Sequence, residues 1–338
     1  MGADLATLAA RARGLGTHLL RRSELEELAG LDLRSLAGAL ARSGRFEPIA
    51  EPATAGAIEA AVRRTAARRL RVLSTWAGSA PALDVFYADQ DRHIVRSMLR
   101  GAIEGAPTER RAAGLLPTPL LPERAIVELS RQPTPARVAA HLVVLRHPEA
   151  DRLFAIASRA QPALFDLELA LSHGFAARIA ASARAGDRNL RELVAERLDE
   201  LNAQTALAIV ASPRDVEPGA CFVDGGAALS REGFVNACGA ESRLAATERL
   251  SIALRGSRIG PVVRDAAGDP ARLERGALGA WLGWQRARAL LDPHSSAPLL
   301  VFLLRLQAQS LDLRRLAWGA SMHAPGPALR AELVTPWT

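Results

Sequence analysis

Three glutamates, Glu59, Glu168 and Glu274, are the residues of this sequence whose type best suits acid–base chemistry. Each follows an apolar residue, so we expect each at the edge of a buried helix face. A carboxylate pair that cleaves glycosidic bonds needs its two groups about 5–10 Å apart. These glutamates lie 109 and 106 residues apart in similar segments, which predicts separate corners of the fold. We therefore predict that each carboxylate braces its own segment, and we assign no catalytic residue.

A polar residue interrupts an apolar helical pattern at His93, Asn202 and Asp312. A buried polar group without a hydrogen-bond partner costs about 1–3 kcal/mol, so we expect each side chain to bond the backbone or a neighbouring helix. The alternative for His93 is a metal ligand. The seven histidines form no H-E-x-x-H pair, and the sequence therefore predicts no metal site.

Composition excludes two further kinds of chemistry. The sequence contains no lysine, and all 43 basic residues are arginine. A phosphate-binding P-loop and a Schiff-base enzyme both need a lysine amine, so neither is possible. Cys221 and Cys238 lie 17 residues apart, which is not a metal or redox spacing. No glycine-rich dinucleotide loop follows a strand. We predict a protein that is not an enzyme and that binds no cofactor.

A run of arginines accompanies a formal net charge of +7 and a pI of about 10.9. On a helix, Arg64, Arg68 and Arg71 share one stripe, and Arg63 lies close to it. This stripe is either a plainly solvated face or a contact for an acidic protein or lipid headgroup. A nucleic-acid site would need interleaved aromatic residues, and only Trp76 is near. We predict no nucleic-acid partner and keep the four arginines as possible partner contacts.

The elements that hold these residues are predicted to be helices, because alanine, leucine and arginine are abundant. Pro298 suits the first turn of a helix over 299–318, and Ser23 with Glu26 forms a capping-box pattern for a helix ending at Leu28. The longest apolar run, 297–304, falls far short of the ~20 residues that span a bilayer. After Asp187, one face recurs at 3.6-residue spacing through Leu190, Leu193, Val194, Leu198, Leu201, Thr205 and Ala208.

Two stretches rich in proline and glycine, 105–122 and 212–226, divide the chain into thirds. Each third contains one of the glutamates and then, 34, 34 or 38 positions later, one of the polar residues. The polar positions are 109 and 110 residues apart. So many matching offsets indicate a triplicated helical unit. The sequence therefore predicts three helical repeats, 1–112, 113–216 and 217–338.

Short motifs within these thirds have the order and spacing of a known family. One runs from 86 to 101, the second reads Leu-Asp-Glu-Leu-Asn at 198–202, and the third covers 303–316. The opening 10–28 and the closing 328–333 also fit. With these segments, the chain resembles the C subunit of V/A-type rotary ATPases, which is known as the d subunit in eukaryotes, over about residues 10–335. It departs from that pattern at His93 and Asp312, where Asn is usual, and at Gln307, where Glu is usual.

The resemblance implies an all-α fold in which three similar helical domains form a funnel about a pseudo-threefold axis. It implies a non-catalytic rotor part in the central stalk, with the D and F proteins of the shaft and the membrane proteolipid ring as partners. Such a part links ATP hydrolysis or synthesis to proton or sodium transport. It lies on the cytoplasmic face of the membrane and contacts the membrane through the ring only.

Two other functions stay open from the residues alone. A helical-repeat scaffold with other protein partners would also explain the triplication, and its repeats would stack in an open, linear array. A basic nucleic-acid-binding helical protein would explain the pI, and its affinity would fall steeply with salt.

Overall fold

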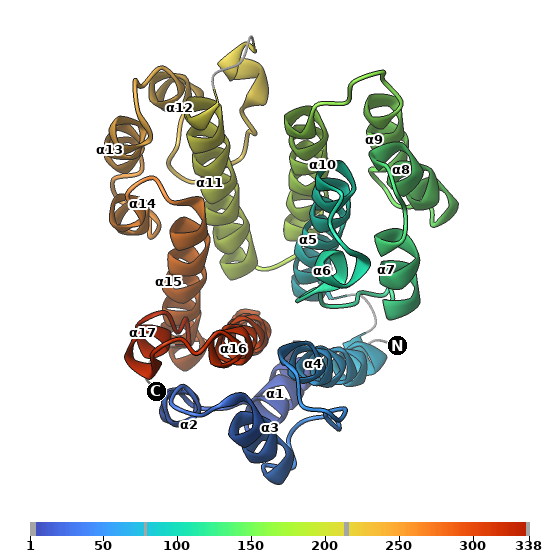
Figure 1. Ribbon diagram of the computed structural model, residues 1–338. Coiled ribbons are helices and arrows are strands. Elements are labelled where there is room, and N and C mark those ends of the chain that lie inside the picture. The colour runs from blue at the N-terminus through green and yellow to red at the C-terminus, as the bar shows by residue number, and fades with distance from the viewer. Residues whose placement is uncertain (1–4, 78–79, 213–215, 336–338) are drawn as a thin grey trace.

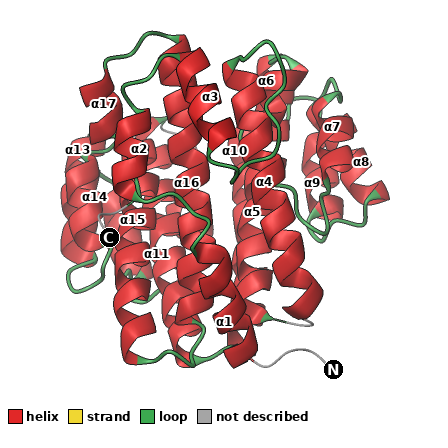
Figure 2. Ribbon diagram, turned by 90° about the horizontal axis from the view of Figure 1, so that it is seen from below, coloured by secondary structure: helices red, strands yellow, loops and turns green. Residues whose placement is uncertain are grey.

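The structure is a computed structural model that describes residues 5–77, 80–212 and 216–335. Every regular element in these ranges is a helix, and Figure 2 shows no strand among them. The predicted all-α class is therefore confirmed, while the threefold funnel stays a prediction. None of the described helices is long and apolar enough to cross a bilayer.

Six long helices form the framework of the molecule. Figure 1 shows them around its middle, with the shorter helices outside them. The three glutamates lie on the first long helix of each predicted third, and His93, Asn202 and Asp312 lie on the second. The six are α4 (Ala55–Ala77), α5 (Pro81–Glu104), α10 (Leu164–Arg184), α11 (Arg188–Ala211), α15 (Pro270–Leu291) and α16 (Ala297–Ser321).

Shorter helices cover the outer faces of this framework. Those near the chain ends are α1 (Leu5–Gly16), α2 (Arg22–Leu28), α3 (Leu33–Arg42) and α17 (Gly326–Ala331). Between α5 and α10 lie α6 (Thr108–Ala112), α7 (Glu123–Ser130), α8 (Pro135–Val144) and α9 (Ala150–Ala157). After α11 come the 3-10 helix η1 (Pro218–Cys221), α12 (Arg231–Cys238), α13 (Arg243–Ala253) and α14 (Gly260–Ala266).

The long helices pair across the predicted thirds. α10 packs against α5, α15 against α11, and α4 against α16. Each glutamate-bearing helix thus contacts the second long helix of another third. The contact between α4 and α16 also brings the first and last parts of the described chain together. An open array of repeats would leave these segments apart, because each repeat of such an array contacts only its neighbours in sequence.

Three apolar clusters hold these helices together. One joins α5 with α7–α10, and another joins α2–α4 with α16 and α17. The largest includes side chains from all three predicted thirds, among them Phe86, Phe175 and Phe302. The first cluster extends across the predicted boundary at 112/113. The boundaries of the sequence repeats therefore stay predictions, and packing is shared between consecutive repeats.

Local sequence sets two of the long-helix starts as predicted. The side chain of Asp187 accepts a hydrogen bond from the backbone N–H of Leu190 at 2.8 Å, which caps α11. Pro298 lies in the first turn of α16, where its missing N–H leaves no bond unmade. Both starts follow from short-range chemistry alone.

The predicted cap of α2 at Ser23 is wrong. Arg21 is the capping residue, and its backbone N–H donates to Glu24 at 2.7 Å. Contacts with a distant segment also hold this helix start. The side chain of Arg22 donates to backbone carbonyls at positions 330, 333 and 335, which holds residue 22 as the first residue of the helix.

Candidate functional site

An arginine on α11 links helices from all three predicted thirds. The side chain of Arg197 is 10% exposed, and its Nη2 donates to Oδ1 of Asp89 on α5 at 2.6 Å. Its Nη1 bonds the carboxylate of Glu200, one turn along α11. Its guanidinium carbon lies 5.3 Å from the ring centroid of Trp281 on α15, within the range of a cation–π contact. One cation thus joins α5, α11 and α15.

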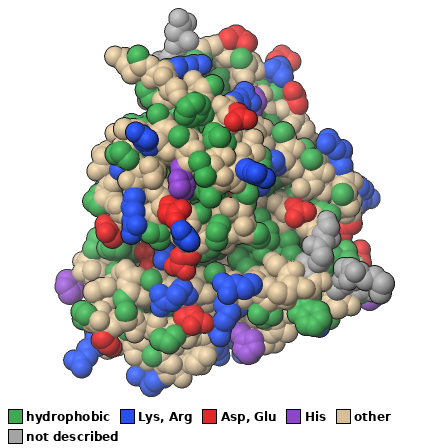
Figure 3. Space-filling model, turned by 90° about the vertical axis from the view of Figure 1, so that its right-hand side faces the viewer, with side chains coloured by type: hydrophobic (Ala, Val, Ile, Leu, Met, Phe, Trp, Pro, Cys, Tyr) green, Lys and Arg blue, Asp and Glu red, His purple; other side chains and the backbone are tan. Residues whose placement is uncertain are grey.

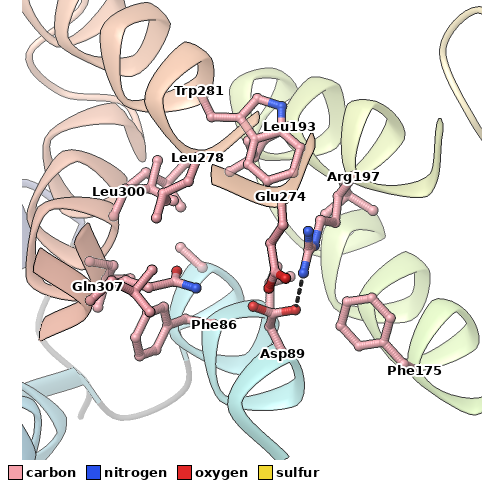
Figure 4. A pocket seen from close by; sticks show the side chains of 16 residues that line it. Phe86, Asp89, Phe175, Leu193, Arg197, Glu274, Leu278, Trp281, Leu300 and Gln307 are labelled. Carbon is pink, nitrogen blue, oxygen red and sulfur yellow. Dashed lines mark hydrogen bonds and ion pairs between the residues drawn. The ribbon is translucent and has the colours of Figure 1, made fainter. Parts of the chain in front are cut away.

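Further charged side chains face Arg197 from α5 and α15. Figure 4 shows the carboxylates of Asp89 and Glu274 pointing toward one another beside it. His93 Nε2 lies 3.4 Å from Asp89 Oδ2 and 3.6 Å from Glu274 Oε1, so His93 contacts a neighbouring helix. Burial acts to raise the pKa of Asp89, but Arg197 and His93 hold that pKa well below its ordinary value. His93 and Arg197 likewise outweigh burial and lower the pKa of Glu274.

Two more charges here are almost completely buried. The side chain of Arg92 is 4% exposed, and its Nη2 lies 3.7 Å from Asp89 Oδ1. Burial raises the pKa of Glu200; Arg197 opposes this shift and Glu274 adds to it. Each buried charge is tolerated only while its partners remain, because an unpaired buried charge is costly. We call the following six residues the central network: Asp89, Arg92, His93, Arg197, Glu200 and Glu274.

A cavity of about 70 Å³ lies beside the central network. Leucine, phenylalanine and valine side chains of α5, α10, α11 and α16 form most of its wall. Figure 4 shows Phe86, Leu300 and Trp281 around it, with the carboxylates at one edge. This volume holds a few water molecules, whereas sites for small organic ligands measure about 300–1,000 Å³. The cavity is therefore too small to be a substrate pocket.

The glutamates brace helices of other thirds. Glu168 on α10 accepts from Arg100 Nη2 of α5 at 3.0 Å. Glu59 on α4 accepts from Trp318 Nε1 of α16 at 2.8 Å, and Glu274 on α15 faces α5 as described above. The prediction that each carboxylate braces its own segment is therefore wrong. The physical reason is the packing, because each glutamate-bearing helix lies against the second long helix of another third.

Asn202 and Asp312 form the backbone hydrogen bonds that their burial requires. Asn202 Nδ2 donates to the carbonyl of Val223 at 2.8 Å, and its Oδ1 accepts from the same residue's N–H at 2.9 Å. Asp312 accepts from the N–H groups of Val334 and Thr335 at 2.7 and 2.9 Å. Each side chain thus ties its long helix to a segment 21–23 residues further along the chain.

The arginine stripe on α4 is largely used within the chain. Arg63 pairs with a carboxylate of α7 at 3.1 Å, and Arg64 donates to the carbonyl at position 48 at 2.7 Å. Arg68 lies 3.0 Å from a carboxylate at position 47 but stays exposed, as does Arg71. On the side of the molecule that carries α7–α9, Figure 3 shows arginines interspersed with acidic side chains. On this face, the mixture differs from the clustered basic patch that is typical of nucleic-acid binding.

The described residues offer little reactive chemistry. They contain no group of three or more His, Cys, Asp or Glu arranged to hold a metal ion. Burial raises the pKa of Cys238 to about 12, with a smaller contribution from Cys221, whose own thiol pKa burial also raises. Both thiols are therefore protonated at neutral pH and are poor nucleophiles. The central carboxylates have arginine or histidine neighbours, so the arrangement stabilises helix–helix contacts.

Sequence reasoning identifies His93 and Glu274 but misses the Arg197–Asp89 pair at the centre. A signal was present, because charged residues are almost never fully buried unless they are paired. Asp89 and Arg92 stand in a charged run inside an apolar helix pattern, and Arg197 stands in a second such run with Glu196, Asp199 and Glu200. That Arg197 bonds Asp89 depends on a contact across 108 residues, which no local pattern encodes.

Comparison with known proteins shows the family to which this chain belongs. No curated protein sequence matches the chain. The family described as ATP synthase (C/AC39) subunit matches residues 8–326, which is nearly all of its 338 residues. The match covers all six long helices and the whole central network. The chain therefore belongs to the ATP synthase (C/AC39) subunit family of the V/A-type enzymes.

Proposed function

We propose that this chain is the central-stalk adaptor of a V/A-type rotary ATPase and joins the D–F shaft to the membrane proteolipid ring. The observation that carries the proposal is the family match over residues 8–326. In this role the chain is a non-catalytic rotor part on the cytoplasmic face of the membrane. It couples ATP hydrolysis or synthesis to proton or sodium transport by transmitting torque.

The central network supports a mechanical role. An adaptor under torque must keep its helices in register, since relative sliding would dissipate the rotation. Arg197 fastens α5, α11 and α15 at one point, and Glu168 and Glu59 fasten α10 to α5 and α4 to α16. These contacts, together with the apolar clusters, connect all six long helices into one body.

The cavity beside the central network, here called the central cavity, is too small to receive a shaft helix. An α-helix with its side chains is about 10–12 Å across, so even one turn exceeds the ~70 Å³ available. We propose that the shaft contacts the ends of the long helices around the cavity, with the helices keeping their present spacing. The proteolipid ring then meets the opposite end of the molecule.

A pull-down tests this function. The purified chain is mixed at low salt with its cognate D–F complex and, separately, with its cognate ring in detergent. We expect retention by both. Failure to bind either one would overturn the proposal.

The same assay tests the exposed part of the arginine stripe. The double variant Arg68→Glu/Arg71→Glu reverses two surface charges on α4, and Arg131→Glu, at the exposed end of α7, is the matched control. If the stripe contacts an acidic partner, the double variant weakens one of the two interactions and raises its sensitivity to salt. Equal binding by all three proteins would exclude the stripe as a contact.

A further inference from the structure

A basic pocket of about 490 Å³ lies between α1 and α16. It uses positions 298, 301, 302 and 305 of α16, whereas the central cavity uses 300, 303, 304, 307 and 311, on the opposite face of that helix. Arg13, Arg21 and Arg305 contribute to its wall. None of the described residues that line it is acidic. The pocket is therefore separate from the central network and concentrates positive charge.

Arg305 is the most buried of these three cations. It is half-buried on a helix of mostly apolar residues. Burial lowers the pKa of its guanidinium, and the neighbouring charges of Arg286 and Arg21 lower it further. Among the described residues, no carboxylate acts on that pKa. Cations held together in a partly desolvated place repel one another, so an anion bound among them would relieve an existing cost.

Part of the pocket wall is apolar. Pro298, Val301 and Phe302 lie beside Arg305 on the same face of α16, and Leu19 also lines the pocket. The pocket volume lies within the range of about 300–1,000 Å³ that small-ligand sites occupy. A pocket of this size suits a small molecule rather than a folded protein partner. Planar guanidinium groups match phosphate oxygens in geometry as well as charge. Together these features describe a site for a phosphate group attached to an apolar body.

We propose that the pocket between α1 and α16 binds a phosphate-bearing anion through Arg13, Arg21 and Arg305. The source of the phosphate is either a phospholipid headgroup at a membrane surface or a soluble phosphate compound. In both cases the phosphate lies among the arginines. The apolar wall then covers the neighbouring part of the ligand. The pocket is formed by this chain alone, so the proposal does not rest on the proposed function.

The experiment uses the full chain and two probes. Inorganic pyrophosphate is titrated into the protein at low salt by isothermal calorimetry. Separately, flotation compares vesicles of phosphatidylcholine alone with vesicles that also contain phosphatidylglycerol. The variants are Arg305→Gln and Arg21→Gln, and Arg131→Gln, directly after α7 and outside the pocket lining, is the matched control. Arg21 is exposed, so its variant reports on the site even if Arg305→Gln impairs folding.

We expect saturable binding of at least one probe by the wild type. Each charge-assisted contact contributes enough that loss of Arg305 or Arg21 should weaken binding about tenfold or more, while the control binds as the wild type does. Pyrophosphate binding assigns a soluble phosphate source, and binding only to phosphatidylglycerol vesicles assigns the headgroup. The proposal is overturned if the wild type binds neither probe, or if both site variants bind as tightly as the control.

Discussion

Replacing Arg197 by Met is expected to destabilise the whole helical framework. The substitution keeps an apolar stem beside Trp281 but removes the cation that Asp89 and Glu200 share. Breaking a buried ion pair from one side costs about 3–5 kcal/mol, because the remaining charge stays buried without its partner. This range applies because only 10% of the Arg197 side chain is exposed.

This magnitude can be converted into a melting temperature. Unfolding entropy is about 2.1 cal/mol/K per residue, or roughly 0.7 kcal/mol/K for 338 residues. A loss of about 3–5 kcal/mol then lowers Tm by roughly 4–7 °C. Circular dichroism at about 222 nm follows the loss of helix. Heating then gives Tm, and urea titration gives the free energy of unfolding.

A matched control and a double variant make the test specific. Arg191→Met removes an exposed arginine from the same helix and should change stability by less than about 0.5 kcal/mol. Adding Asp89→Asn to Arg197→Met should cost less than Asp89→Asn costs alone, because the carboxylate has already lost its main partner. The reasoning is refuted if Arg197→Met is no more destabilising than Arg191→Met, or if the two central substitutions are additive.

Three other contacts lead to further predictions. Asp312→Ala leaves the amides at 334 and 335 without their acceptor. We expect the free energy of unfolding to fall by about 2–4 kcal/mol and hydrogen exchange to become faster at both amides. Unchanged exchange would contradict this. Glu168→Gln removes a half-exposed ion pair with α5 and should cost about 1 kcal/mol in urea unfolding, against no measurable loss for the surface variant Glu128→Gln. The pKa of Asp89 is lower in the folded state than its unfolded value of 3.8. The stabilisation by Asp89 is therefore fully present above pH 3.8 and is lost as pH falls through the folded-state pKa, so the Tm difference between wild type and Asp89→Asn should shrink below about pH 3.8. A constant Tm difference from pH 7 to pH 3 would be incompatible with this assignment.

Short-range chemistry explains which parts of the fold can be predicted from sequence. The start of α11 follows from Asp187 and the 3.6-residue spacing after it, and the start of α16 follows from Pro298. The predicted cap of α2 is wrong by two residues: Arg21 and Glu24 form it, and Arg22 is also held by carbonyls about 310 residues away in sequence. Local patterns specify helices, whereas distant partners adjust their ends.

The same distinction applies to the candidate site. The regular spacing of the repeated glutamates and polar residues can be read from the sequence. In the structure they lie on the first and second long helix of each third, as that spacing suggests. Their partners are not visible. Glu59 binds Trp318 across 259 residues, and Arg197 binds Asp89 across 108. The packing of apolar faces decides which helices lie side by side. Periodicity in the sequence shows which face of a helix is apolar, but it does not show which other helix packs against that face.

The most direct test of the adaptor role is to locate this chain within the assembled motor. The complex is purified from its native membranes through an affinity tag on this chain, and its structure is determined by electron cryo-microscopy. We predict density for the chain between the D–F shaft and the proteolipid ring, in contact with both. Purification without the shaft and ring, or density for the chain at any position that does not bridge them, would contradict the proposal.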